Sequence, residues 1–321
     1  MLSSLASGFR SLARNWGLVA LVLLANLAFA LALAVPLSMR LERDLAGRGA
    51  SSAMMYGFDF DWWAEWSERQ VGPSSALAPD LLGTGFAFRN LALLLRGALP
   101  AGLFAPGERL GVDPTTLGVG VLYFLLQVFL AGGILGVFRA PRGGWTVRGL
   151  VHGAGFYFGR LLRVSLLALA AAGVLFAVNV PVARWVDGLA REAVSGRTAI
   201  VLVFGRYALL LFGLVLVHMV SSYAKVLVVS EERLSAGLAV LSSLGFCARN
   251  LLAALGQYVV VAALGVVLLV LFGTLDARLA VVGWKTQVVA LALFEAFVAA
   301  KVALRLGLLA SQVELHAARG R

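Results

Sequence analysis

Charged residues are scarce in this chain. Asp, Glu, Lys and Arg make up only 13% of its 321 residues, whereas they make up about a quarter of an ordinary soluble domain. Hydrophobic residues account for 61% of the sequence, and the mean hydropathy is +0.92. This composition excludes an ordinary soluble enzyme and predicts a polytopic membrane protein.

Cysteine and lysine are also rare. The single cysteine, Cys247, excludes an intrachain disulfide and a cysteine-based metal site. The only lysines are Lys225, Lys285 and Lys301, so the other basic residues are all arginine. Together with the abundance of Ala, Leu, Val and Gly, this usage indicates a bacterial genome of high GC content.

Known catalytic motifs are absent from the sequence. Its histidines, His152, His218 and His316, have neither His-x-x-x-His nor His-Glu-x-x-His spacing. No Gly-x-Ser-x-Gly nucleophile elbow occurs, and there is no Walker loop. We therefore predict that the protein is not an enzyme and holds no metal or cofactor.

Six nearly uncharged runs are long enough to cross a hydrocarbon core of about 30 Å, which takes roughly 20 helical residues. They cover residues 16–37, 116–138, 161–182, 198–221, 251–272 and 286–304. The predicted fold is all-α, a polytopic membrane helical bundle of about six transmembrane helices with additional interfacial amphipathic helices.

The distribution of basic residues predicts the orientation in the membrane. The N-terminal flank contains Arg10 and Arg14 without an acid, and the connection between the second and third spans contains five arginines without an acid. Such flanks stay in the cytoplasm. We predict a bacterial inner-membrane protein with both termini cytoplasmic, and we attribute its net charge of +11 to contacts with anionic lipid headgroups rather than with nucleic acid.

Two parts are expected along the chain. Residues 1–139 form an N-terminal transmembrane hairpin whose long connection, about residues 40–115, is a periplasmic cap. Residues 140–321 form a four-span bundle with a cytoplasmic linker helix at about residues 225–250. Ser230 is the predicted N-cap of this linker, with Glu232 and Arg233 in its first turn.

A short pattern recurs before the first, third and fifth spans. In each place a Gly-Phe pair is followed by an arginine, which is Arg14, Arg160 or Arg249. These arginines are predicted membrane-interface anchors, because an arginine side chain can extend to the headgroup phosphates. The pattern reflects either internal repetition or the general preference for arginine where a helix enters a membrane.

An aromatic and acidic segment lies in the predicted cap. Trp62, Trp63 and Trp66 alternate with carboxylates between residues 58 and 68. The favoured interpretation is an amphipathic helix, capped by Asp59 or Asp61, whose tryptophans are anchors in the outer aromatic belt. A site for a hard cation and a partner-binding face are the alternatives.

Ionisable residues inside the spans are the main candidates for a functional site, since an isolated charge in hydrocarbon is costly. Arg206 in the fourth span and Glu295 in the sixth share a depth of roughly 12–14 Å from the outer side. They either pair to hold two spans together, line a polar cavity for a substrate or proton, or never meet. His218 in the fourth span is expected to make one interhelical hydrogen bond rather than to relay protons.

The region around the linker carries a family resemblance. Its residues are Tyr223-Ala224-Lys225-Val226, Glu231-Glu232-Arg233-Leu234-Ser235-Ala236 and Cys247-Ala248-Arg249-Asn250. The chain here resembles uncharacterised bacterial six-span membrane proteins that are similar to the membrane domain of some glycerophosphodiester phosphodiesterases. The resemblance implies a cytoplasmic segment joining two transmembrane helices, and it implies no activity. The start of the linker also has the opening spacing of the segment by which importer permeases dock on an ATPase, without its later part.

The favoured function is a non-enzymatic scaffold or accessory subunit of a membrane complex. The alternative is a permease or transporter subunit with a polar cavity near Arg206 and Glu295. The expected partners are the lipid bilayer with its anionic headgroups and either another membrane subunit or an ATPase, and no nucleic acid is expected.

Overall fold

The structure, a computed structural model, describes residues 1–46, 59–70, 74, 114–140, 145–279 and 283–319. These residues form helices and no strand, which confirms the predicted all-α fold. The helices are α1 (Leu2–Arg14), α2 (Gly17–Leu45), α4 (Phe60–Glu68), α7 (Pro114–Arg139), α8 (Val147–Glu192), α9 (Gly196–Ser230), α10 (Ala236–Arg249), α11 (Leu251–Asp276) and α12 (Trp284–Arg319).

Six of these helices, α2, α7, α8, α9, α11 and α12, are long and apolar enough to cross a membrane. Each corresponds to one of the predicted spans, and the chain is accordingly a multi-pass integral membrane protein. The helices extend beyond the predicted spans; α8, for example, has 46 residues. The difference arises because an uncharged run marks only the part of a helix in hydrocarbon, whereas the helix continues into more polar residues.

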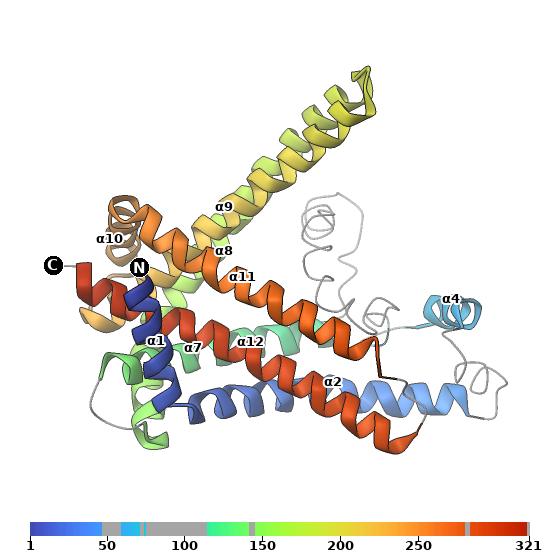
Figure 1. Cartoon of the computed structure of the whole chain (residues 1–321), viewed down its shortest axis with the longest axis horizontal. Helices are drawn as coiled ribbons and strands as arrows, with labels where there is room; N and C mark the ends of the chain where they lie inside the picture. The colour runs from blue at the N-terminus through green and yellow to red at the C-terminus, as the bar shows by residue number, and fades with distance from the viewer. Residues whose placement is uncertain (47–58, 71–73, 75–113, 141–144, 280–282, 320–321) are drawn as a thin grey trace.

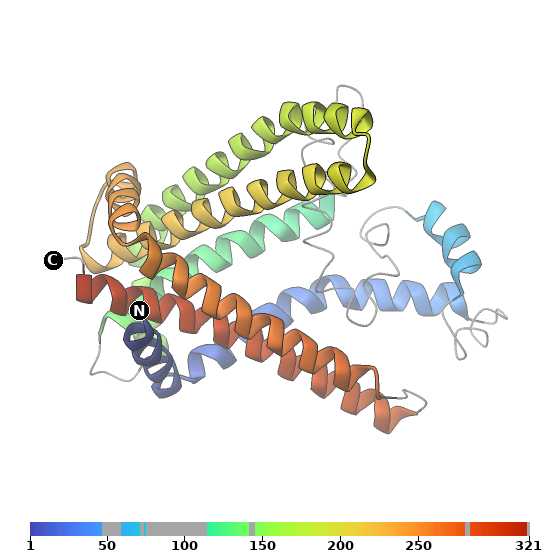
Figure 2. The same ribbon diagram turned by 45° about the horizontal axis from the view of Figure 1, so that its top comes forward.

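The long helices converge at one end of the bundle and separate at the other (Figure 1). Both termini, α1 and α10 lie at the converging end, which we call the terminal end. The connections α8–α9 and α11–α12 lie at the opposite, open end, far from each other in both views (Figure 2). Packing of α7 along α8 and of α1 against α12 crosses the predicted boundary after residue 139.

Asparagine residues mark two sharp changes of helix direction. Asn15 separates α1 from α2, and Asn250 separates α10 from α11, with nearly equal backbone angles (φ −119°, ψ 36° and φ −120°, ψ 28°). Each asparagine donates its side-chain amide to the carbonyl four residues earlier, that of Ser11 or Phe246. At the copy of the recurring pattern that precedes the third span, Leu161 occupies the corresponding place, and α8 continues unbroken.

The linker helix begins later than predicted. Ser230 is the last residue of α9, not the N-cap of the linker, and α10 starts at Ala236 with Ser235 as its N-cap. Glu232 between them has a φ of +54°, a left-handed conformation that a helix cannot continue through. The acidic side chains of this turn are ion-paired elsewhere in the chain, so they do not serve the first turn of α10.

Small residues bring neighbouring helices into close contact. Gly132 and Gly133 of α7 are buried against α8, where a Cβ atom at Gly133 would overlap the carbonyl of Leu150. Gly8 of α1 lies in the same way against the backbone of Ser311 in α12. Because lipid tails are as apolar as the helices, such close backbone packing is a main source of association within a membrane.

We predict that Gly133→Ala destabilises the protein and that Gly136→Ala does not. The added methyl at Gly133 forces α7 and α8 apart, whereas nothing lies within 4 Å of the equivalent atom at Gly136. Alanine is also the better helix former by about 1 kcal/mol, so Gly136→Ala should be neutral or stabilising. Thermal unfolding of both variants in detergent tests this, and equal midpoints would contradict the proposed contact.

Candidate functional site

A buried amide joins four helices at the terminal end. Gln257 of α11 is completely buried. Its Nε2 donates to Ser4 Oγ of α1 (3.2 Å) and to the Ser311 carbonyl of α12 (3.0 Å), while its Oε1 accepts from the Tyr223 hydroxyl of α9 (3.0 Å). Every polar atom of this side chain therefore has a partner, and each partner lies on a different helix.

A second hydrogen-bond chain continues from the same region. The Ser222 hydroxyl donates to Gln312 Oε1 (2.6 Å), and Gln312 Nε2 donates to the Tyr258 oxygen (3.0 Å). The Tyr258 oxygen lies 3.1 Å from His218 Nδ1. The Tyr258 hydroxyl and His218 Nδ1 therefore share a hydrogen bond whose donor depends on the tautomer of the imidazole. The expected interhelical hydrogen bond of His218 is thus present, from α9 to α11.

These polar residues border a small cavity between α7, α9 and α12. Its volume is about 160 Å³. The lining includes the cationic side chains of Lys225 and Arg305 together with His218, and the polar side chains of Gln127, Ser221 and Ser222. Among the described residues, no carboxylate lines this cavity. The sequence pattern did not single out Lys225 or Arg305 as a site residue, because both lie just beyond the uncharged runs 198–221 and 286–304.

The last turn of α9 is held by two arginines. Arg139 of α7 donates to the Val229 carbonyl (2.9 Å) and to Glu232 Oε1 (2.8 Å). Arg160 of α8 donates to the Glu232 carbonyl (3.4 Å) and lies over the Phe156 ring. The predicted anchor Arg160 therefore also contacts the turn between α9 and α10.

The neighbouring Glu231 is paired on both carboxylate oxygens. One oxygen contacts Arg233, and the other lies 3.2 Å from His316 Nε2 of α12. Glu231 and Glu232 are the two acids of the segment that has the opening spacing of an ATPase-docking segment. Both are therefore paired with residues of this chain.

Arg206 pairs within its own hairpin. Its Nη1 lies 3.5 Å from Asp187 Oδ1 of α8, and its guanidinium lies over the Tyr207 ring. Of the three alternatives for Arg206 and Glu295, pairing is not found among the described residues: both residues lie in the open-end halves of their helices, and these halves diverge (Figures 1 and 2). Glu295 is half-buried on α12. The equal depth of Arg206 and Glu295 in the membrane did not identify the partner of Arg206, because the sequence does not reveal the directions in which the two hairpins extend.

The remaining interface anchors occupy helix ends. Arg14 and Arg249 are exposed in the last turns of α1 and α10, each directly before an asparagine break. Their guanidinium groups are therefore available at the terminal end of the bundle.

The aromatic segment forms the helix that the sequence predicts, capped by Asp59, whose carboxylate accepts from the Trp62 amide (3.0 Å). Trp62 stacks on Trp66, and Trp66 is buried with its indole N–H bonded to Asp44 of α2 (2.8 Å). Trp66 thus attaches α4 to α2, while Trp63 is half-buried. Most of the predicted cap, residues 47–58, 71–73 and 75–113, lies outside the described residues.

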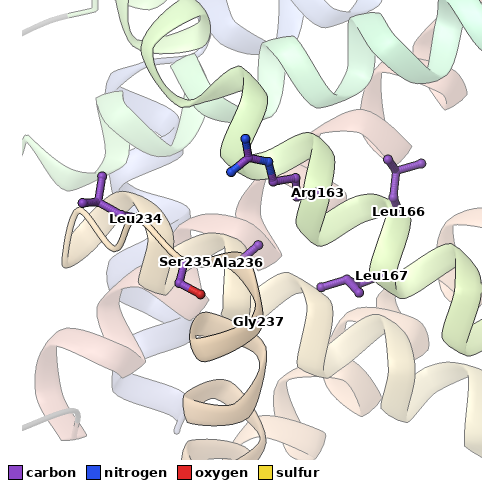
Figure 3. Close-up of a pocket in the computed structure, with 7 residues that line it drawn as sticks. All are labelled: Arg163, Leu166, Leu167, Leu234, Ser235, Ala236 and Gly237. Carbon is purple, nitrogen blue, oxygen red and sulfur yellow. The ribbon is translucent and has the colours of Figure 1, made fainter.

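No metal-binding cluster is found in the part of the chain that the structure describes, where no three His, Cys, Asp or Glu side chains come together. An open hollow of about 720 Å³ lies between α8 and the start of α10 (Figure 3). In it Leu167 points toward Ala236 and Gly237, and Arg163 is its only charged residue. The hollow therefore brings together fewer polar groups than the cavity between α7, α9 and α12.

Comparisons with known proteins add no assignment, since no family model, no curated protein and no solved structure matches the chain.

We predict that Arg206 is energetically coupled to Asp187 and not to Glu295. The Arg206 side chain is 9% exposed and that of Asp187 is 49% exposed, so the coupling should be roughly 0.5–1 kcal/mol. Double-mutant cycles combine Arg206→Met with Asp187→Asn and with Glu295→Gln. Thermal unfolding of these variants in detergent measures the two coupling energies. A larger coupling with Glu295 would show that the hairpins meet at the open end.

Cys247 should be almost unreactive in the native protein. Burial in α10 raises the pKa of its thiol to about 11, so the reactive thiolate is rare at neutral pH. The rate of reaction with Ellman's reagent should therefore be low at pH 7 and should rise as the pH approaches 11. A matched control is Cys247→Ala combined with Leu244→Cys, which moves the thiol to an exposed position on the same helix. Equal rates for the two proteins at pH 7 would refute the burial.

Proposed function

We propose that the protein is a non-enzymatic scaffold or accessory subunit that holds another membrane subunit between its two diverging hairpins. The observation that carries this proposal is the separation of α8–α9 from α11–α12 at the open end (Figures 1 and 2). The hairpins are joined at the terminal end by buried hydrogen bonds from Ser222 and Tyr223 of α9 to Gln312 of α12 and Gln257 of α11, so the space between them is framed by elements that are fixed relative to one another.

The surfaces of both hairpins suit a membrane partner. Phe204 on α9 is 71% exposed and Leu291 on α12 is 61% exposed, and both lie in the open-end halves of their helices. Gly205 beside Phe204 has nothing within 4 Å of the place where a Cβ atom would lie. Small and apolar residues of this kind allow a transmembrane helix to approach closely.

The proposed setting is a bacterial inner membrane with the terminal end in the cytoplasm. Arg14, Arg160 and Arg249 support this orientation, because arginines accumulate on the cytoplasmic side. The family resemblance around the linker supports the same placement. A membrane subunit is favoured over an ATPase as partner, since Glu231 and Glu232 are already paired within the chain.

The alternative of a permease subunit with a cavity near Arg206 and Glu295 has less support. Arg206 contacts Asp187 of its own hairpin, and the open-end half of α12 diverges from α9. Among the described residues, Arg206 therefore faces an acid of its own hairpin rather than Glu295.

Photo-cross-linking from both hairpins tests the scaffold proposal. A photoreactive amino acid is placed at Phe204 or at Leu291 in the full chain and activated in native membranes. We expect both positions to capture the same protein, which should also copurify in equimolar amount in mild detergent. Leu210, which is buried on α9, is the matched control and should capture no other protein.

Adducts with lipid alone at both Phe204 and Leu291 would overturn the proposal. So would capture of unrelated proteins by the two positions, because a subunit seated between the hairpins has to contact both.

A further inference from the structure

The cavity between α7, α9 and α12 contains two cations that have no counterion in the part of the chain that the structure describes. Lys225 of α9 and Arg305 of α12 line it from different helices. Neither forms an ion pair within 4.0 Å among the described residues, and the cavity walls described above include no carboxylate. Two positive charges therefore face the same small space.

Such an arrangement is electrostatically unfavourable by itself. Like charges repel, and the apolar neighbours Phe124, Leu308 and Leu309 replace part of the water around the cationic groups. An anion in the cavity would remove both costs, since it attracts each cation and accepts their hydrogen bonds.

We propose that this cavity binds a phosphate-bearing anion between Lys225 and Arg305. The guanidinium of Arg305 can bind two phosphate oxygens at once, and the ammonium of Lys225 supplies further donors. His218 lines the same cavity, and the hydrogen bond between its Nδ1 and Tyr258 of α11 holds its ring in place. The site therefore combines two charged donors with an imidazole that is positioned by a neighbouring helix.

The size of the cavity limits the ligand. Its volume of about 160 Å³ is smaller than the pockets of about 300–1,000 Å³ that hold drug-sized molecules. A single phosphate group matches this space better than a nucleotide does.

Two sources can supply this phosphate, a lipid headgroup and free inorganic phosphate. The 35 residues of α9 span about 52 Å, which exceeds a hydrocarbon core of about 30 Å. Lys225 is five residues from the end of α9, about 7–8 Å along the axis, and so lies near the expected headgroup layer. A soluble anion would reach the same groups from the aqueous side.

Ligand-induced thermal stabilisation of the full chain in detergent tests the proposal. The probes are inorganic phosphate and phosphatidylglycerol, with phosphatidylcholine as the zwitterionic comparison. The variants are Lys225→Met and Arg305→Met, and Lys285→Met serves as the control because it removes a charge from α12 outside the cavity.

The wild type and Lys285→Met should be stabilised in a saturable manner by at least one of the two anionic probes. Each cavity substitution should weaken this binding by about tenfold or more, as expected for a lost hydrogen bond to a charged group. A response to inorganic phosphate identifies a free-anion site, and a response to phosphatidylglycerol alone identifies a headgroup site. Without ligand, the cavity variants should unfold at the same temperature as the wild type or higher, because an unpaired cation has been removed.

Arg305→Glu is a second test that places a carboxylate beside Lys225. This variant should fold and should no longer respond to either probe, since its own side chain now neutralises the lysine. The proposal is wrong if neither probe stabilises the wild type, if the cavity variants respond as the wild type does, or if Lys285→Met is weakened equally. If no cavity variant folds, native mass spectrometry of the wild type decides, and absence of any phosphate-bearing adduct overturns the proposal. None of these outcomes depends on the scaffold function.

Discussion

The arrangement of the bundle depends on the need to satisfy one buried amide. Gln257 lies among apolar helices, where an unpaired donor or acceptor costs several kcal/mol. Its amide reaches Ser4, Ser311 and Tyr223 at the same time. Because these partners belong to α1, α12 and α9, satisfying Gln257 brings four helices to one point and makes the terminal end compact.

The same constraint accounts for the separation of the hairpins at the open end. Away from the terminal end, α9 and α12 present mostly apolar side chains, and contact between them gains little over contact with lipid. The one described ion pair in this region, Arg206 with Asp187, lies within a hairpin and so does not draw the two hairpins together. Polar groups thus fix one end of the molecule and leave the other open to a partner.

Much of the fold could be predicted because bilayer thickness sets the length of an apolar run, and all six spans were found in this way. The partners of polar residues could not be predicted, since the depth of a residue along a helix does not reveal the direction in which the helix runs or the face on which the residue lies. For this reason Arg206 contacts Asp187 rather than Glu295, and Lys225 and Arg305 line one cavity although the sequence gives no sign that they are neighbours. The sequence shows Asn15 and Asn250 where the other copy of the pattern has Leu161. Only the structure shows that the helices break at the two asparagines and that α8 continues through Leu161.

The proposed anion site and the scaffold share the same helices. Lys225 lies three residues from Ser222, which bonds to Gln312 of α12, so the cavity adjoins the contact that sets the position of α9 relative to α12. A bound anion would add attraction between these helices where two cations now oppose it. Among the described residues, the hydrogen bonds that join the two hairpins all lie at this end. An anion held here would therefore reinforce the junction that keeps the hairpins fixed relative to one another.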